Sequence, residues 1–412
     1  MPVDNIVVGL DIGTTKVTVV IGEVTGNGSL EITGIGRSLS FGLRRGVVIN
    51  IESTLKSIAA AVEAAELMSG RETDAVYTSI SGGHIEGINS RGVVAVTGRG
   101  REITQSDVDR VIEAAKAIVI PMDREVLHVI PQEYIVDDQG GIKDPLDMIG
   151  VRLEAEVHII TGSVTSAQNL VKCINRAGLK VEGIILASLA AAEAVLTREE
   201  KELGVLLIDL GGGTTDFIVY LDGAPYFTSV LPIGGAQVTG DLSIMLKIPV
   251  DNAEKIKREV GCCHFSLIEP GQEVILPGFG GRPPLAVSRK DICAIIQPRI
   301  AEIFSMVREK VEKKGYSKRL SGGVVLTGGG ALLPGAVELA QEIFGYPARV
   351  GLPTNLGGLV GEYQSPEYAA GVGLVMFAAE RVLPAGREGG IKERTEGRFL
   401  SSLKQWFRNF FE

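Results

Sequence analysis

The apolar positions along the chain follow one pattern twice. The stretches NIVVGLDIGTTKVTVVIGEV and LGVLLIDLGGGTTDFIVYLDG each hold an apolar run, an aspartate, a turn of glycine and threonine, and a second apolar run rich in β-branched residues. This order predicts a buried strand, a tight turn and a return strand, so each copy should form a β-hairpin. Asp11 and Asp209 occupy the same place in the two copies, 198 residues apart. The repeat predicts two similar domains in one chain.

The two turns have the composition of an anion site. Glycine lacks a Cβ, so its backbone N–H groups can converge on an anion, and the threonine hydroxyls and a lysine add donors. An aspartate before each turn suits a phosphate only if a cation lies between them, and Mg²⁺ is held by one or two carboxylates together with phosphates and retained water. One copy alone could equally be a structural glycine-rich hairpin with a capping aspartate, whereas two copies favour a nucleotide with Mg²⁺. The expected phosphate-binding residues are Gly13, Thr14, Thr15, Lys16, Gly211, Gly212, Gly213, Thr214 and Thr215, and the expected Mg²⁺ ligands, through water, are Asp11 and Asp209.

A third glycine-rich element follows in GGVVLTGGGALLPGAVELAQEIF. A short apolar run meets Gly328, Gly329 and Gly330, and a helical pattern comes next. Such a strand–glycine–helix turn lets a ligand approach the backbone at the N-terminus of a helix. The spacing fits neither the dinucleotide fingerprint nor the P-loop.

The length, net charge and cysteine content of the chain limit the class of protein to which it can belong. A chain of 412 residues is too long for one core, so several subdomains are expected. A net charge of −9 argues against a nucleic-acid partner, which would require a basic face. Four cysteines without CxxC spacing indicate a reduced, cytosolic protein; Cys262 and Cys263 beside His264 could bind a soft metal, but a small apolar segment is favoured. We expect no signal peptide and no membrane-spanning segment.

The two Asp–Gly–Thr hairpins and the TGGGA turn resemble the superfamily of actin, the sugar kinases and the seventy-kilodalton chaperones. The resemblance implies two domains that close on ATP–Mg²⁺. It implies that the two hairpins, with Lys16, hold the phosphates and that the Gly328 turn faces the adenosine. In NAEKIKREVG, Glu254 and Lys257 match the superfamily's Glu-x-x-Lys, which flanks the ribose and base. Their spacing puts both on one helix face, where a solvated salt pair is the alternative.

The segment between the hairpins identifies a narrower resemblance. Thr104 is expected to cap a helix through QSDVDRVIEAAKAI that Pro121 ends, and the alternation in EVLHVIPQEYIV and VRLEAEVHIIT predicts strands. The stretches DREVLHVIPQEY, GIKDP and GVRLE closely resemble the insert of the FtsA family of actin-like bacterial cell-division proteins, and the resemblance covers nearly the whole chain. His128 and His158 lie in the strand patterns, so we expect packed or surface histidines and not metal ligands.

The resemblance implies a cell-division protein that binds ATP–Mg²⁺, self-assembles into actin-like filaments and tethers FtsZ to the inner face of the cytoplasmic membrane at the division site. The implied partners are the C-terminal peptide of FtsZ, further copies of the chain, other division proteins and an anionic membrane surface. Arg299 matches the family's Pro-Arg pair and, with Arg289, is expected to contact the acidic FtsZ peptide, although a solvated arginine would look the same. Ala187 in LASLAAAEAVL stands where the related MreB has a glutamate that orients the attacking water, so at most weak ATPase activity is expected.

The C-terminal stretch differs from the rest of the chain. Residues 383–412 carry six Lys/Arg and four Asp/Glu, a net charge of +2 that leaves −11 for the remainder. Residues 384–397 have four glycines and no apolar face, so a flexible linker is expected. At 100° per residue, the large apolar side chains of GRFLSSLKQWFRNFFE fall within an arc of about 140°. A helix packed on the body or on another protein is possible, but the linker and the positive flanks favour an amphipathic helix lying in a membrane surface. Its expected membrane-contacting residues are Phe399, Leu400, Leu403, Trp406, Phe407, Phe410 and Phe411.

The expected fold is therefore α/β: an actin-like, ribonuclease H-like two-domain ATPase fold with an FtsA-type α+β insert and a C-terminal amphipathic helix. Two rivals remain open. One is a PilM-like type IV pilus assembly protein that binds a partner peptide, and the other is a sugar kinase or phosphatase, for which no catalytic acid is evident. The expected divisions are 1–83, 162–192 and 352–383 for the first domain, 84–161 for the insert, 193–246 and 291–351 for the second domain, 247–290 for its small lobe, 384–397 for the linker and 398–412 for the terminal helix.

Overall fold

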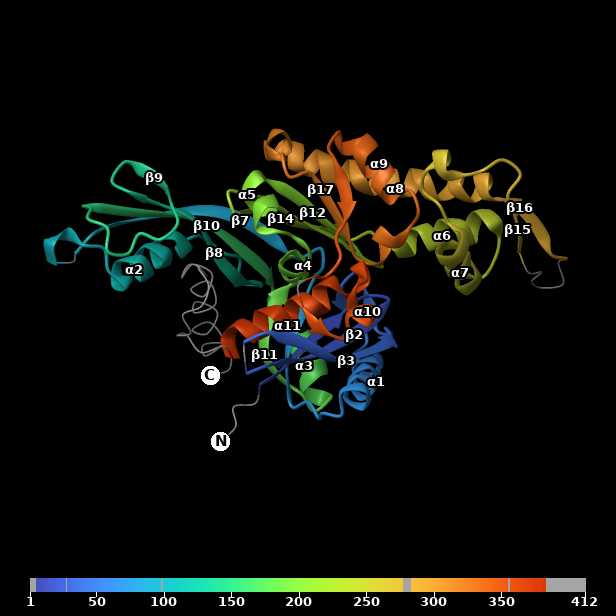
Figure 1. Ribbon diagram of the computed structural model, residues 1–412, viewed down its shortest axis with the longest axis horizontal. Helices are drawn as coiled ribbons and strands as arrows, with labels where there is room; N and C mark the ends of the chain where they lie inside the picture. Colours follow the sequence, from blue (N-terminus) through green and yellow to red (C-terminus); the bar gives the residue numbers. More distant parts are fainter. Residues whose placement is uncertain (1–4, 27, 98, 277–282, 355, 383–412) are drawn as a thin grey trace.

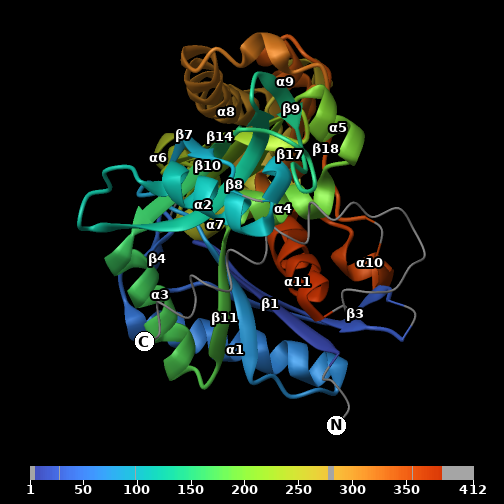
Figure 2. The ribbon, with the colours of Figure 1, turned by 90° about the vertical axis from the view of Figure 1, so that its left-hand side faces the viewer.

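The computed structural model describes residues 5–26, 28–97, 99–276, 283–354 and 356–382 (Figure 1). Within these ranges two mixed sheets form two domains, and an insert extends from one side of the molecule (Figures 1 and 2). Each domain and the insert has its own cluster of buried apolar side chains. The α/β actin-like architecture with an inserted α+β subdomain is as the sequence predicts. The predicted linker and terminal amphipathic helix lie outside the described residues.

The first domain is built on a six-stranded sheet in the order β11-β6-β1-β2-β3-β19. Its first hairpin is antiparallel, β6 runs parallel to β1, and the edge strands β11 and β19 run parallel to β6 and β3. Helices α1 and α3 cover one face, and α4 and α11 cover the other. The bounds are β1 (Ile6–Ile12), β2 (Lys16–Val24), β3 (Leu30–Leu39), β6 (Ala75–Ile80), β11 (Lys180–Leu186), β19 (Gly357–Gly358), α1 (Ile51–Ser69), α3 (Val164–Arg176), α4 (Ala187–Val195) and α11 (Ala369–Val382).

The second domain repeats this plan with the second hairpin. Strands β12, β13 and β14 form an antiparallel meander, and β17 and β18 extend the sheet in parallel. The bounds are β12 (Val205–Leu210), β13 (Thr215–Leu221), β14 (Ala224–Leu231), β17 (Val324–Thr327), β18 (Ala348–Val350), α5 (Arg198–Leu203), α6 (Gly235–Leu246), α7 (Val250–Val260), α8 (Arg289–Lys313) and α9 (Ala336–Phe344). Ser288 caps the N-terminus of the long helix α8 and Gly315, with φ 79°, follows its end, as the sequence predicts.

The insert consists of an antiparallel sheet covered by one helix. Its elements are β7 (Glu86–Ala95), α2 (Gln105–Lys116), β8 (Arg124–Val136), β9 (Gln139–Ile142) and β10 (Arg152–Ser163). Thr104 caps α2 in a capping box with Asp107, which confirms the predicted start. The helix ends at Lys116, earlier than predicted, because β-branched residues and then a proline follow, and the residue before a proline disfavours the helical conformation.

The insert sheet joins the second-domain sheet although the insert branches from the first domain. A single residue pair, Ser229 with Glu86, connects β14 to β7 and continues the sheet through β10, β8 and β9. The insert therefore touches both domains. The remaining short elements are β4 (Leu43–Arg44), β5 (Val47–Val48), β15 (Glu273–Leu276), β16 (Leu285–Ser288), α10 (Val360–Tyr363), η1 (Arg99–Arg101), η2 (Phe265–Leu267), η3 (Ser317–Arg319), η4 (Gly329–Leu332) and η5 (Pro366–Tyr368).

Candidate nucleotide site

The two hairpin turns meet tip to tip. Each turn is closed by the same backbone bond, from Gly13 N–H to Lys16 O and from Gly211 N–H to Thr214 O, both at 3.0 Å. A Cβ on Gly212 would lie 2.6 Å from Thr15 Oγ1, closer than real Cβ atoms come to other atoms. A Cβ on Gly213 would be equally close to Thr14. The glycines of the second tip are thus the residues that let the first tip approach, and the fold brings together turns about 200 residues apart in the chain.

Three aspartates lie beside these tips. Ser79 Oγ donates to Asp11 at 2.6 Å, and Ser81 Oγ donates to both carboxylate oxygens of Asp216 at 2.7 and 2.8 Å. Burial raises the pKa of Asp11 and raises that of Asp216 to about 6. Burial, followed by the charges of Asp216 and Asp11, raises the pKa of Asp209 well above its usual range. Asp216 was not predicted, although it closes the GGGTTD stretch of the second hairpin.

Lys16 has a partner that the sequence did not indicate. Its Nζ donates to the backbone oxygen of Glu367 at 2.5 Å and to the Glu367 carboxylate at 3.1 Å, and it lies 4.7 Å from the ring centroid of Tyr368. Burial lowers the pKa of Lys16, against the opposing effect of the Glu367 charge. The positive charge expected at the first tip is therefore held by the η5 segment.

The third glycine-rich turn packs on the second hairpin. Gly328 has φ 79°, and a Cβ there would overlap Asp209 Oδ1. A Cβ on Gly330 would lie 2.5 Å from Leu210. The predicted helix does not begin at this turn, because the short helix η4 comes first and Pro334 and Gly335 precede α9. The Gly328 turn thus lies against Asp209 and caps the short helix η4, and it is not the N-terminus of α9.

Glu254 and Lys257 lie on one face of α7, as their spacing predicts, with 2.6 Å between Nζ and the carboxylate. Lys257 also donates to Gly235 O at 3.1 Å and to Thr239 at 3.0 Å. Gly235 in turn begins α6, and its N–H donates to Gly211 O at 2.9 Å. A chain of hydrogen bonds therefore connects the Glu254–Lys257 pair with the second hairpin tip.

The two arginines expected to bind a partner occupy α8. Arg299 donates to Asp241 through Nε at 2.6 Å and Nη2 at 3.1 Å, and it also pairs with Glu302. Arg289 donates to Gln272 at 2.7 Å. They are ten positions apart, or about 15 Å along the helix. Both side chains are therefore held by neighbours within the chain.

The residues considered as metal ligands are packed. His128 and His158 are buried; His128 accepts from Leu186 N–H, and His158 contacts Asn89 and Thr228. Burial lowers the pKa of His158 to about 3. All four cysteines are buried and form no disulfide bond with one another. No group of three or more His, Cys, Asp or Glu side chains among the described residues is arranged to hold a metal directly.

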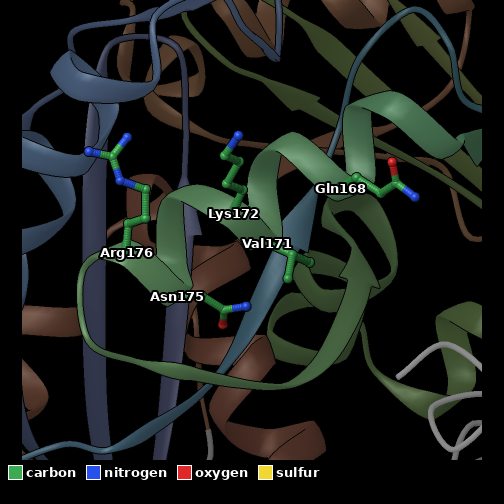
Figure 3. A pocket seen from close by; sticks show the side chains of 5 residues that line it. All are labelled: Gln168, Val171, Lys172, Asn175 and Arg176. Atoms are coloured by element: carbon green, nitrogen blue, oxygen red, sulfur yellow. The ribbon is translucent and has the colours of Figure 1, made fainter. Parts of the chain in front are cut away.

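Other features of the described residues bear on the remaining expectations. A shallow hollow lies on the outer surface of α3 and is lined by that helix alone (Figure 3), so it shares no residue with the hairpin site.

Ala187 is buried at the first position of α4. No helix in the described ranges combines the length and apolar character that crossing a membrane requires. The expected membrane-contacting residues, from Phe399 to Phe411, lie outside the described residues.

Two domains that bring paired Asp–Gly–Thr hairpins together beside a glycine turn define an actin-like, nucleotide-binding fold. Two solved structures share it. The PilM–PilN type IV pilus biogenesis complex matches with a TM-score of 0.64 and 18% identity, over 92% of this chain and 99% of that chain. MreB5 of Spiroplasma citri, solved with ADP bound, matches with a TM-score of 0.58 and 14% identity, over 92% and 98%. At these identities the likeness concerns the fold alone.

Closer comparisons define the family. Two family models match, the SHS2 domain inserted in FtsA at residues 82–161 and the cell division protein FtsA at residues 206–373. The chain is 51% identical to cell division protein FtsA of Borreliella burgdorferi over 98% of both chains. It is 39% identical to that of Escherichia coli K12, over 99% of this chain and 98% of the relative. The chain therefore belongs to the FtsA family of cell division proteins.

Proposed function

We propose that this FtsA-family protein binds ATP with Mg²⁺ between its two hairpin tips, self-assembles into actin-like filaments and tethers FtsZ to the inner face of the cytoplasmic membrane. The observation that carries the nucleotide part is the meeting of two glycine–threonine turns beside three buried carboxylates. Backbone N–H groups and hydroxyls of both turns supply phosphate donors. The raised pKa values of Asp11, Asp209 and Asp216 mean that the negative charge of each ionised carboxylate is poorly stabilised by its surroundings. A divalent cation would supply the missing stabilisation.

In this proposal Asp11 and Asp209 hold Mg²⁺ through its retained water, and Asp216 supports them. Lys16 contacts the phosphates that bind at the first tip, while Glu367 positions the amine of Lys16. The Gly328 turn and the Glu254–Lys257 pair flank the nucleoside part of the nucleotide. The ADP-bound MreB5 structure, which has the same fold, supports a nucleotide in this class of protein.

We further propose that turnover is slow. The first position of α4 is Ala187, whose methyl group cannot orient an attacking water. Nucleotide state would then act chiefly as a switch for assembly, and hydrolysis would reset it slowly.

Membership of the family implies partners among division proteins, and we propose the acidic C-terminal peptide of FtsZ at the α8 face bearing Arg299 and Arg289. Arg299 already holds Asp241 bidentately, so an incoming carboxylate would share the guanidinium or displace Asp241. Because that exchange replaces one carboxylate with another, the affinity for a single peptide should be modest.

We propose that the terminal amphipathic helix makes the protein a peripheral protein of the cytoplasmic face at the division site. Seven large apolar side chains yield roughly 10–20 kcal/mol on full burial, at about 1.5–3 kcal/mol each. Partial burial at an interface and the ordering of the helix offset most of this, so one tail holds weakly. A filament with many tails would hold strongly, which couples assembly to attachment.

The nucleotide site is tested with Asp209→Ala, measured by calorimetric ATP binding with and without Mg²⁺. The wild-type chain should bind more tightly with Mg²⁺, and the variant should lose most of that difference. Asp138→Ala is the matched control, because its side chain is 99% exposed and lies in the insert. Equal Mg²⁺-dependent affinity in wild type and Asp209→Ala would contradict the site.

A further inference from the structure

A row of lysines at the C-terminal end of α8 lies beside the contact at which β14 of the second domain meets β7 of the insert, which we call the seam. Lys310 and Lys314 lie one turn apart, Lys318 follows in η3, and all three are exposed. Helix α8 runs from β16 toward the side on which the insert lies (Figure 1). Lys310 Nζ donates to Ser229 Oγ on β14 at 3.1 Å, which fixes this end of the helix beside the strand that meets the insert.

The lysine row carries uncompensated charge. Among the described residues none of the three lysines forms an ion pair; Lys314 Nζ instead lies 5.7 Å from the centroid of the Phe227 ring. Most acidic side chains of the surrounding elements are paired with another cation: Glu309 with Lys313 at 2.6 Å, Glu312 with Arg308 at 3.5 Å, Asp222 with Arg319 at 2.8 Å and Glu86 with Arg124 at 3.4 Å. Glu133 of β8 instead accepts the Gly141 N–H at 2.6 Å. A positive surface thus stands on a chain whose net charge is −9.

The surface beneath the row is rigid. The rings of Tyr226 and Tyr316 meet edge to face with centroids 6.2 Å apart. Asn89 of the insert donates to Tyr226 O at 3.1 Å and to Tyr316 Oη at 3.3 Å. Two buried residues of the insert reinforce the seam, since Gln132 donates to Pro225 O at 2.9 Å and His158 contacts Thr228 at 2.9 Å. A surface held in this way loses little conformational freedom when it binds a ligand.

The spacing of the charges matches an extended chain. Four residues of α-helix advance about 6 Å, which separates Lys310 from Lys314 along α8. Alternate residues of an extended peptide, which point to the same side, are about 6.6 Å apart. We propose that the lysine row is a docking surface for an acidic peptide segment of a partner protein, bound in extended conformation with carboxylates at alternate positions.

A peptide fits this surface better than a lipid or a nucleic acid does. Lys314 and Arg319 cover faces of the Phe227 and Tyr226 rings, at 5.7 Å in each case, so those faces are not free to stack on bases. The row itself presents no large exposed apolar side chain to enter a membrane. The surface is also separate from the face proposed for FtsZ, since Lys310 follows Arg299 by eleven positions of α8, or about 16 Å.

The test uses the full chain and a fluorescein-labelled peptide of six Glu-Thr repeats, measured by fluorescence anisotropy, with six Gln-Thr repeats as the uncharged probe. The variant Lys310→Glu/Lys314→Glu/Lys318→Glu is compared with Lys172→Glu/Lys180→Glu/Lys255→Glu, which changes net charge equally at exposed lysines elsewhere. Wild type and the control should bind the acidic peptide and not the Gln-Thr peptide. The lysine-row variant should bind it at least tenfold more weakly while still unfolding cooperatively on heating.

Three outcomes would overturn the proposal. One is equal affinity in wild type and the lysine-row variant, and another is equal binding of the two peptides. The third is loss of anionic-vesicle binding in the lysine-row variant without loss of peptide binding, which would make the row a lipid site. In the Arg299→Glu background the lysine-row substitutions should still weaken binding of the Glu-Thr peptide at least tenfold, so failure of the FtsZ assignment is distinguishable from failure of this one.

Discussion

The variant Asp216→Asn should stabilise the protein in the absence of nucleotide and Mg²⁺. The Asp216 carboxyl is buried beside Asp11 and Asp209, and its pKa is raised from 3.8 to about 6. A carboxyl group whose pKa is higher in the folded than in the unfolded protein favours folding while it is protonated. This contribution is complete at pH values below the pKa of the unfolded state, and it is lost as the pH rises through the pKa of the folded state. At 1.36 kcal/mol per pH unit, ionisation at pH 7.5 costs the folded state about 3 kcal/mol. Asparagine cannot ionise and keeps an acceptor for the Ser81 hydroxyl, so it avoids this loss.

The assay is urea denaturation of wild type and Asp216→Asn at pH 5 and pH 7.5. The variant should gain about 3 kcal/mol at pH 7.5 and about half of that at pH 5, where the unfolded carboxyl is ionised but the folded one is still largely protonated. Asp138→Asn, at an exposed position, should show no such gain. Saturating Mg²⁺–ATP should raise the stability of wild type more than that of Asp216→Asn, because the cation compensates the ionised carboxylates. A variant no more stable than wild type at pH 7.5, or a gain independent of pH, would refute this account of the aspartate cluster.

Four further predictions follow from other parts of the molecule. Arg299→Glu should weaken binding of an acidic FtsZ-tail peptide in anisotropy measurements and leave ATP binding intact; unchanged peptide affinity would place the contact elsewhere. Phosphate release should stay far below the enzyme median of about 10 s⁻¹, even in filaments, whereas a rate near that median would contradict the role given to Ala187. Gln132→Leu removes the side-chain donor to Pro225 O at this buried contact and should cost about 1–3 kcal/mol in urea denaturation; no loss would show that the insert is held in other ways. Trp406 emission should shift to the blue on addition of anionic vesicles, and removal of residues 398–412 should abolish vesicle pelleting but not ATP binding; fixed emission with the intact protein in the supernatant would exclude the membrane helix.

The local elements were predictable because short-range patterns determine them. Both hairpins, the capped starts of α2 and α8 and the shared face of Glu254 and Lys257 follow from apolar periodicity, turn chemistry and helical spacing. The early end of α2 and the η4 turn after Gly328 were missed, because prolines and β-branched residues change the backbone over only a few positions.

The long-range partners could not be predicted from one sequence. Glu367 lies 351 residues from Lys16, and nothing in the local pattern around Pro366 marks it as a partner of the first hairpin. Asp216 is a polar residue at the start of a strand, and only the fold places it beside Ser81. The joining of β14 to β7 through one residue pair depends on the relative placement of the insert and the second domain. A single sequence contains no signal for that placement.

The most direct test of the proposed tethering function is co-sedimentation of a labelled FtsZ C-terminal peptide with anionic vesicles, with the full chain and Mg²⁺–ATP present. Vesicles alone should leave the peptide in the supernatant, and adding the chain should bring it into the pellet. The chain lacking residues 398–412 should fail to carry it down. If the intact chain pellets with the vesicles while the peptide stays in the supernatant, or if the chain itself does not pellet, the protein is not the link between FtsZ and the membrane.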